Sequence, residues 1–493
     1  MLLSDIRYLA FLFIVVILYY VISSGKLRRP ILLAASYYFY YTMSHVYIVI
    51  LLAVTALTYF GALALQSKEA EARKGLLFGL LLGTVLTPLV VLKYSAFVLG
   101  AMAGIFGLSV SGHQLLSGWA LPVGISFFTF AAVGYLIDVY LELIPPESRP
   151  LYMALFLAFF PLVTAGPIER GGRLIPQFDC DYKFSAQNGF AALRVIFWGL
   201  VLKLLIADNL AGQVNAFFSA APKSAVPLER LFATVHYVFY LYADFAGYSL
   251  LAIGSAQLMG LKVSPNFQQP FLSATVPEFW RTWHISLSSW VRDYLFATLR
   301  TSWRHYRNRG MAMALIVSFL ILGLWHGAGW GFILFGLMHG LLVTGSTFTL
   351  QRRNSFWVKT DGTLPVWLYP SRVVATFFFV TLTFVVFRAP SIQDAFDIYK
   401  GIFSYHFLVN LVQFCASFVF DFVHPLHFQY ITGSMQWILI GILIIGDICV
   451  RKGLTLESLW LPVRFVAYNA GVILILYTWL SGNVAAPFLY YKF

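Results

Sequence analysis

The strongest constraint on this sequence is the length and number of its apolar runs. The run from residue 30 to residue 66 contains no Asp, Glu, Lys or Arg, and other apolar runs recur along the chain. Only 11% of the residues are charged and 60% are hydrophobic, whereas a soluble globular protein has about 25% charged residues. Lipid must therefore cover much of the surface. We predict an all-α polytopic membrane protein in which residues 1–493 form one integral membrane domain.

The lengths of the apolar runs predict how often the chain crosses the membrane, because one helical crossing needs about 20 residues. The 30–66 run is long enough for two helices, with a break expected at Ser44-His45. The runs at 75–110 and 310–350 are also long enough for two elements each. Further runs occupy residues 6–23, 119–141, 151–165, 188–207, 231–260, 371–388, 410–423, 434–450 and 464–480. We expect about 11 to 13 membrane segments, of which the shortest are re-entrant.

The positive charges indicate the orientation of the chain in the membrane. The net charge is +13, and cytoplasmic loops of membrane proteins are enriched in Lys and Arg, so membrane lipid is an expected partner and nucleic acid is not. The cluster at residues 26–29 follows the first apolar run, so we expect that run to be retained, with its N-terminus outside. The clusters at 300–309 and 352–353 are expected to share the cytoplasmic face. The three cysteines fit neither a disulfide framework nor a zinc site.

One histidine lies within an almost entirely apolar stretch, in the sequence LGLWHGAGW at residues 322–330. An ionisable group at membrane depth is costly and usually faces a cavity, a pore or a partner. A straight helix from Arg309 would carry His326 about 25 Å, to the middle of a bilayer. Gly327 and Gly329 would allow another backbone or a ligand to approach closely. A neutral imidazole here is suited to act as a general base; for His339 we expect a structural role.

A second polar group lies in TVPEFWRTWHISLSSWVRDYLF, residues 275–296. We expect one helix with Pro277 in its first turn and Thr275 or Ser273 as its cap. Helical periodicity places one set of polar residues on a single face: Arg281, His284, Ser288 and Arg292. It places an aromatic and apolar set on another face: Trp280, Trp283, Leu287, Trp290 and Tyr294. An interfacial amphipathic helix would explain the tryptophans and arginines, but the alignment of His284 and Ser288 with them favours a functional wall.

Two other segments carry polar residues among apolar ones. Asp244 lies in the small-residue-rich segment 240–260 and needs a buried partner, either an arginine or backbone N–H groups, so structural pairing is favoured over a functional role. The segment 160–178 contains prolines and glycines together with Glu169 and Arg170. We predict that it forms a re-entrant loop at the mouth of a cavity.

Four motifs occur in order along the chain: FPLVTAGPIERGGRLIPQF, YADFAGYSLLAIG, FWRTWHISLSSWVRDYLF and LWHGAGWGFILFGLMHG. Together they resemble the membrane-bound O-acyltransferase family, and most closely its bacterial alginate O-acetyltransferase branch. The family-like core extends from about residue 121 to residue 345. The resemblance implies a helical bundle that encloses a central tunnel, with short re-entrant helices, in the bacterial inner membrane.

The resemblance also implies an active site. His326 corresponds to the central histidine of the family and His284 to the second polar position that faces it, so both are predicted to be catalytic. The residues predicted to line the substrate tunnel are Trp280, Arg281, Trp283, Ser288, Trp325 and Asp244. The residues predicted to dock the acyl donor are Arg300, Arg304, Arg307 and Arg309. Such a site needs no bound cofactor and no metal, because acetyl-CoA or an acyl-carrier thioester enters as a substrate.

The expected function is that of an acyltransferase, which moves an acetyl group from a cytoplasmic thioester across the inner membrane for O-acetylation of an exported polysaccharide such as alginate. A periplasmic acetyltransferase of the SGNH type is the expected partner. The stretch YLFATLRTSWRHYRNRG departs from the alginate branch, which has a Pro-Leu-Gly-Gly turn there. Transfer of D-alanyl or another acyl group to a cell-wall polymer therefore stays open. A transporter and a structural subunit of an export complex are further alternatives.

Overall fold

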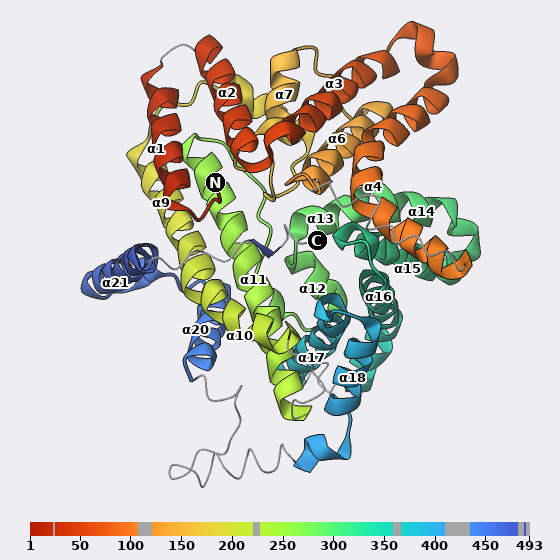
Figure 1. The fold of residues 1–493 in the computed structure, drawn as a ribbon, viewed down its shortest axis with the longest axis vertical. Helices are drawn as coiled ribbons and strands as arrows, with labels where there is room; N and C mark the ends of the chain where they lie inside the picture. Colours follow the sequence, from red (N-terminus) through yellow and green to blue (C-terminus); the bar gives the residue numbers. More distant parts are fainter. Residues whose placement is uncertain are drawn as a thin grey trace.

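The structure is a computed structural model that describes residues 1–22, 25–106, 121–219, 227–357, 365, 367–409, 434–481 and 488–489. The described residues form helices joined by loops, with no strand among them (Figure 1). The prediction of an all-α membrane protein is therefore confirmed for this part of the chain. The apolar run at 410–423 lies outside the described residues.

The helices of the first half lead from the N-terminus to the long central helix α11. Their bounds are α1 Ile6–Val21, α2 Gly25–Ser44, α3 Ile48–Leu65, α4 Lys74–Phe106, α6 Ile125–Tyr140, α7 Pro150–Ala158, α8 Gly171–Leu174, α9 Ala186–Leu200, α10 Asp208–Ser219 and α11 Pro227–Leu258. A π-helical turn at Val201–Ala207 joins α9 to α10. Short 3-10 turns lie at His45–Tyr47, Lys68–Arg73 and Ile175–Asp179.

Of the helices of the second half, α12 to α18 lie on the right of Figure 1, whereas α20 and α21 lie on the left, near α9 and α10. Their bounds are α12 Val276–Thr282, α13 Ile285–Trp290, α14 Ala297–Ser302, α15 Arg307–His326, α16 Trp330–Trp357, α17 Leu368–Arg388, α18 Ile392–Ile402, α20 Ser434–Arg451 and α21 Leu461–Leu480. A second π-helical turn, Val291–Phe296, joins α13 to α14. Short 3-10 turns lie at Pro270–Leu272, Arg304–Tyr306 and Leu456–Ser458.

Two of the three predicted helix breaks are present. The 30–66 run is divided by the 3-10 turn His45–Tyr47, and the 310–350 run is divided between α15 and α16. The prediction of two elements at 75–110 is wrong, because α4 continues as one helix through Pro88. Proline removes one backbone donor, and membrane helices tolerate this loss where neighbouring groups satisfy the backbone. A proline within an apolar run therefore did not mark a break here.

Seven helical stretches of the described chain are long and apolar enough to cross a membrane. They are Lys26–Leu65, Glu71–Phe106, Ala186–Ser219, Arg304–His326, Trp330–Leu350, Leu368–Arg388 and Leu461–Leu480. This number is below the 11 to 13 segments that we expected from the sequence. Several apolar runs instead form shorter helices, such as the 16-residue α1 and α6 and the 9-residue α7. Because the seven stretches cover only the described residues and Lys26–Leu65 contains both α2 and α3, the expected number of membrane segments remains a prediction.

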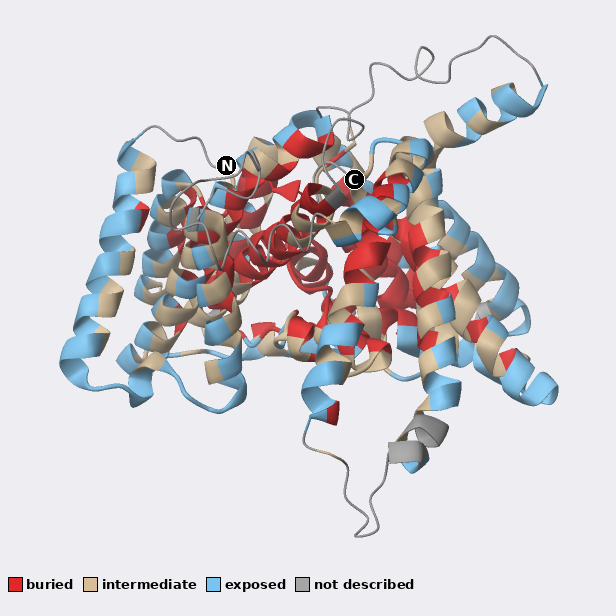
Figure 2. Cartoon of the chain, turned by 90° about the horizontal axis from the view of Figure 1, so that it is seen from below, coloured by how far each residue is buried: buried red, intermediate tan, exposed pale blue. Residues whose placement is uncertain are grey.

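Buried residues gather in the middle of the molecule, whereas the outer helices expose their side chains (Figure 2). Apolar side chains on these outer helices are strongly exposed; Leu480 of α21 is 85% exposed and Ile105 of α4 is 78% exposed. A protein in water rarely exposes large contiguous apolar areas. The exposed apolar side chains are the ones that lipid would cover.

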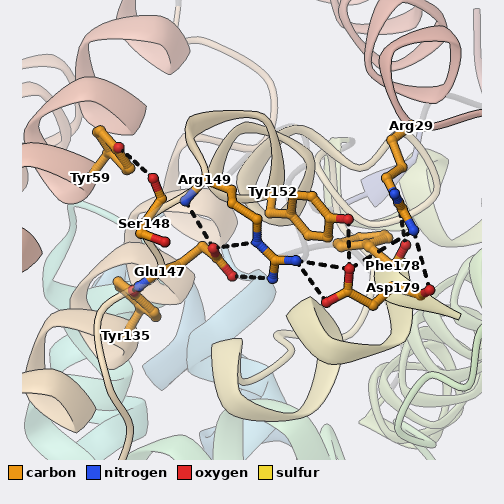
Figure 3. A network of polar contacts seen from close by, with 9 residues as sticks. All are labelled: Arg29, Tyr59, Tyr135, Glu147, Ser148, Arg149, Tyr152, Phe178 and Asp179. Carbon is orange, nitrogen blue, oxygen red and sulfur yellow. Dashed lines mark hydrogen bonds and ion pairs between the residues drawn. The ribbon is translucent and has the colours of Figure 1, made fainter. Parts of the chain in front are cut away.

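An ionic network ties together segments that are far apart in the sequence (Figure 3). Arg149 Nη1 lies 2.8 Å from both carboxylate oxygens of Asp179, and Arg149 Nε donates to Glu147 at 2.7 Å. Tyr152 donates its hydroxyl to Asp179 at 2.7 Å, and Arg29 of α2 donates to the Phe178 carbonyl at 2.8 Å. The network therefore joins α2, the start of α7 and the turn after α8 at one end of the molecule.

Candidate active site around His326 and His284

His326 is the last residue of α15, which packs closely against α16. A side chain at Gly323 would meet the Phe332 carbonyl oxygen at 2.3 Å, and one at Gly336 would meet the Phe319 carbonyl oxygen at the same distance. A side chain at Gly327 would lie 2.2 Å from the Phe332 ring, so the turn after His326 requires glycine there. These glycines let the two helices approach closely.

Aromatic rings surround His326, which is 3% exposed. Its ring centroid lies 5.1 Å from that of Trp325, 5.2 Å from that of Phe387 and 5.9 Å from that of Phe335. The interplanar angles of 73°, 73° and 86° describe edge-to-face contacts, which aromatic rings favour. The imidazole is thus held in a largely apolar environment contributed by α15, α16 and α17.

The carbonyl groups at the end of α15 are bound by two side chains of α4. Lys93 Nζ donates to the Trp325 carbonyl at 2.6 Å, and the Tyr94 hydroxyl donates to the Leu324 carbonyl at 2.7 Å. The last carbonyls of a helix have no partner within the helix, and a cation there also interacts favourably with the helix dipole. Lys93 and Tyr94 therefore fix the peptide groups that directly precede His326.

His284 lies in a turn and not within a continuous helix. α12 ends at Thr282, Trp283 is extended, and His284 adopts a left-handed conformation with φ +44° before α13 begins. A non-glycine residue rarely adopts positive φ and usually needs support from its surroundings. Asn266 provides such support: its carbonyl accepts from the Ile285 N–H at 2.9 Å, and its Oδ1 lies 3.1 Å from His284 Nδ1.

The predicted single polar face of residues 275–296 is therefore wrong. The break at residues 283–284 turns His284 into the core, where it is 0% exposed, while Arg281 and Arg292 stay exposed. Ser288 donates to the Trp283 carbonyl at 3.0 Å. The predicted cap is present, since the Thr275 side chain accepts from the Glu278 N–H. Helical periodicity failed because it assumes one unbroken helix.

The same break separates the other predicted wall residues from His284. Arg281, Ser288 and Trp280 line a cavity of about 210 Å³ between the segment Val276–Phe296 and α15. Neither His284 nor His326 lines this cavity. The tunnel through the membrane that we expected remains a prediction.

The two candidate catalytic histidines nevertheless lie against the same indole ring. The Trp325 centroid lies 5.1 Å from that of His326 and 5.8 Å from that of His284. The ring centroids of Phe127 and Phe130 of α6 also lie 5.6 Å from that of Trp325. Residues 42 positions apart in the sequence are thus brought into one aromatic cluster, in which Trp325 is the shared contact.

His339 is held by hydrogen bonds at both ring nitrogens. Trp280 Nε1 donates to its Nδ1 at 3.1 Å, and its Nε2 lies 2.8 Å from Thr383 Oγ1. Because the Thr383 hydroxyl donates to the Val380 carbonyl, Nε2 must carry the ring proton of a neutral His339. These contacts agree with the structural role expected for His339. Trp280 and Trp283 are 6% and 2% exposed and belong to the core.

Asp244 belongs to a buried ionic cluster. Lys203 Nζ lies 2.8 Å from Asp244 Oδ1 and 2.7 Å from Asp208 Oδ1. Asp244 Oδ2 also accepts from the backbone N–H of Leu489 at 2.8 Å, and Phe488 stacks on Tyr248 of α11 at 4.3 Å. Asp244 thus binds a backbone N–H, as one of the two predicted alternatives had it, and its cationic partner is a lysine and not an arginine.

The remaining predicted positions lie away from the histidines or are exposed. Glu169 Oε1 accepts from the Ser264 N–H, and Arg170 lies 3.2 Å from Asp293; the loop at residues 159–169 is buried. The four arginines predicted to dock the donor, Arg300, Arg304, Arg307 and Arg309, are all exposed. Their docking role remains a prediction.

Three residues that contact the predicted site residues were not predicted from the sequence. Lys93 and Lys203 are charged residues inside apolar runs. A charge at membrane depth usually has a partner or a function, and this argument, which singled out Asp244, applies equally to both lysines. Asn266 lies in the loop between α11 and α12 and is neutral. The sequence offered no signal for its contact with His284.

Comparisons with known proteins identify the family of this chain. Residues 35–388 match the membrane-bound O-acyltransferase family. A probable alginate O-acetylase of Pseudomonas aeruginosa is 33% identical over 73% of this chain and 66% of its own length. A peptidoglycan O-acetyltransferase of Helicobacter pylori is 32% identical over 72% and 70%, respectively. A teichoic acid D-alanyltransferase of Bacillus subtilis is 30% identical over 56% and 69%.

The matched region contains α3 to α17 and therefore both histidines, Trp325, Lys93 and Asn266. It ends at Arg388, the last residue of α17, so the segments from α18 onward are not covered by the family match. The aligned part spans about two thirds of the length of the relatives named above. On this evidence the chain belongs to the membrane-bound O-acyltransferase family.

Proposed function

We propose that this protein transfers an acetyl group from a cytoplasmic thioester across the bacterial inner membrane, for O-acetylation of an exported polysaccharide. The relatives from Pseudomonas aeruginosa and Helicobacter pylori are named for O-acetyl transfer, which supports the acetyl group. The donor would be acetyl-CoA or an acyl-carrier thioester. A periplasmic SGNH-type acetyltransferase would pass the group on to the polymer.

The observation that carries the proposal is the contact of His326 and His284 with one indole in an apolar cluster. Burial disfavours a charged imidazole, and a neutral imidazole is the form that can accept a proton. The two rings come from different segments, the end of α15 and the turn before α13. Two histidines at one site can divide the tasks of binding and proton transfer.

The proposed step transfers the acyl group without a covalent enzyme intermediate. Neutral His326 takes the proton from the acceptor hydroxyl as its oxygen attacks the thioester carbonyl carbon. The tetrahedral intermediate then breaks its C–S bond, and the leaving thiolate takes the proton from His326. The products are an ester and a free thiol. Holding donor and acceptor in line would supply much of the rate.

Access to His326 would require movement of nearby side chains, because its ring is 3% exposed. The tunnel that brings the two substrates together would then belong to a conformation in which the surrounding rings, such as Phe387, are displaced. The exposed arginines at 300–309 would bind the phosphates of coenzyme A or an acidic carrier. Neutral substitutions there should raise KM for the donor and leave acceptor preference unchanged.

A second candidate function is the transfer of a D-alanyl group to a cell-wall polymer. Relatives in Bacillus subtilis and Streptococcus thermophilus, both 30% identical, are named teichoic acid D-alanyltransferases. The purified protein should be offered acetyl-CoA and, separately, a D-alanyl carrier protein. Consumption of only the second thioester would replace the acetyl proposal with this one.

The test of the main proposal compares His326→Ala with wild type in cells and in detergent. We expect a folded, membrane-inserted variant that consumes the thioester at least ~10²-fold more slowly, because general-base catalysis contributes about 10²–10⁴-fold. The matched control is His236→Ala, which removes a buried histidine that packs on Trp437 at 4.6 Å. Wild-type acetylation of the polymer by His326→Ala would reject the assignment.

A further inference from the structure

Asn266 connects three segments at the centre of the molecule and is 1% exposed. Its Nδ2 donates to Ser249 Oγ of α11 at 3.0 Å. Its Oδ1 accepts from the Ser286 N–H at 3.3 Å and from the Ser286 hydroxyl at 3.0 Å, and it lies 3.1 Å from His284 Nδ1. The amide side chain therefore contacts α11 with its nitrogen and the turn at His284 with its oxygen.

The orientation of this amide follows from its contacts. A backbone N–H can only donate, so the Asn266 atom that faces the Ser286 N–H must be the oxygen. The same oxygen faces His284 Nδ1. A carbonyl oxygen can only accept, so Nδ1 must carry the hydrogen of this bond. In the neutral ring the lone pair then lies on Nε2.

We infer that Asn266 is a positioning residue that holds His284 as the Nδ1–H tautomer, so that the neutral ring acts as a hydrogen-bond acceptor at Nε2. The inference rests on the proposed function for its chemical meaning. In an acyl transfer, His284 Nε2 would accept a hydrogen bond from a second donor group of the acceptor, such as a neighbouring hydroxyl, and orient the acceptor, while His326 takes the proton of the attacking hydroxyl. Neutral His284 would then carry no hydrogen at Nε2 to donate to the oxyanion.

The backbone of Asn266 supports the same arrangement. Its carbonyl accepts from the Ile285 N–H at 2.9 Å, and two residues later Gln268 N–H donates to the Thr282 carbonyl at 3.0 Å. The loop therefore runs along the break between α12 and α13 and holds His284 at its positive φ. Because the backbone contacts do not need the amide side chain, a substitution at Asn266 can alter the tautomer while the turn is kept.

The first experiment measures the tautomer directly. The ¹⁵N chemical shifts of the imidazole nitrogens are recorded for the purified full chain with labelled histidine, and the His284 signals are assigned by their loss in His284→Gln. We expect Nδ1 protonated in wild type and a mixture of tautomers in Asn266→Leu. A wild-type ring protonated at Nε2 alone would overturn the inference. This readout needs no acyl transfer, so it stays informative if the proposed function fails.

The second experiment separates positioning from packing by kinetics. Asn266→Leu should lower kcat on the order of 10²-fold with little change in KM for the donor. When the ring hydrogen moves from Nδ1 to Nε2, His284 can no longer accept a hydrogen bond at Nε2. Asn266→Asp keeps an acceptor oxygen toward Nδ1 and should recover at least tenfold of that loss. Ser249→Ala removes the contact on the other side of the amide and should stay within a few-fold of wild type.

The outcomes can be distinguished even if the leucine variant folds poorly. Equal kcat values for Asn266→Leu and wild type, in protein that elutes as a single species from a sizing column, would overturn the inference. Equal losses in Asn266→Asp and Asn266→Leu, with an unchanged tautomer in both, would also overturn it. Absence of acyl transfer in wild type would reject the proposed function and leave the tautomer measurement standing.

Discussion

The apolar core contains two groups of buried polar side chains that are satisfied in different ways. Around Lys203, Asp208 and Asp244, opposite charges meet at 2.7–2.8 Å. Around His284, His326 and His339, the partners are aromatic rings, an amide and a hydroxyl. Full charges at membrane depth must be neutralised by contact, which leaves little freedom for chemistry. Neutral imidazoles can be buried at lower cost and still exchange a proton.

The two groups also differ in what they connect. The ionic cluster joins the turn after α9 to α11 and to Leu489, so it stabilises the arrangement of segments. The histidine cluster joins α15, α16, α17 and the turn before α13. We therefore expect the ionic cluster to contribute mainly to stability and the histidine cluster mainly to catalysis. The following substitutions test that division.

The largest effect is expected for Lys203→Met. It would leave the Asp244 carboxylate, 0% exposed, without its cation, and breaking a buried pair by removing one partner costs about 3–5 kcal/mol. Thermal unfolding in detergent, followed by the amount of soluble monodisperse protein, measures the loss. The double variant Lys203→Met with Asp244→Leu should recover part of it. A double variant less stable than the single one would contradict the ion-pair explanation.

A smaller effect is expected for His339→Leu, which would leave the Trp280 N–H without its acceptor. A buried polar group left unsatisfied costs about 1–3 kcal/mol. We expect lower thermal stability and, in the protein that remains folded, a near-normal rate of thioester consumption. Loss of catalysis at full stability would move His339 from the structural to the catalytic group.

Lys93→Met tests whether the end of α15 must be held in place. Loss of the bond from Nζ to the Trp325 carbonyl should let the peptide before His326 shift and lower kcat about tenfold, which corresponds to about 1.4 kcal/mol. Lys93→Arg should retain more activity, because it can still donate to that carbonyl. Tyr94→Phe removes the neighbouring bond to Leu324 and should have the weaker effect. Unchanged kcat in Lys93→Met would show that helix packing alone positions His326.

The smallest effect is expected from the exposed ionic network of Figure 3, which contrasts with the buried one. Hydrogen bonds from Tyr152 and Arg149 lower the pKa of Asp179, and Arg149 lowers the pKa of Glu147. The stabilisation is therefore fully present above the ordinary carboxyl pKa of about 4 and is lost as the pH falls through the lowered values.

Because Arg149 and Asp179 are 45% and 47% exposed, the network should contribute at most about 1 kcal/mol. Melting temperatures of wild type and Arg149→Met, measured from pH 7 to pH 3, should differ at neutral pH and converge in acid. A difference that persists at pH 3 would point to packing of the arginine on Tyr152, whose ring centroid lies 3.6 Å from the guanidinium carbon.

Local patterns predicted the fold better than the site. The break at Ser44-His45 and the division of the 310–350 run into two helices follow from run lengths and local polar residues, which are properties of neighbouring residues. The polar face of 275–296 was wrong because a local period cannot reveal that Asn266 supports a positive φ at His284. Composition located the apolar runs but not the length of each helix, such as the 9 residues of α7.

The sequence by itself determined that this is a helical membrane protein, that a histidine lies within an apolar stretch, and which family the motifs resemble. Hydrophobic length and glycine spacing are enough for those conclusions, because lipid leaves the backbone few alternatives to helix. Only the tertiary structure decided that His284 and His326 share Trp325, that Asn266 orients His284, and that Lys203 neutralises Asp244. These contacts join residues far apart in the chain, so they depend on how whole helices pack.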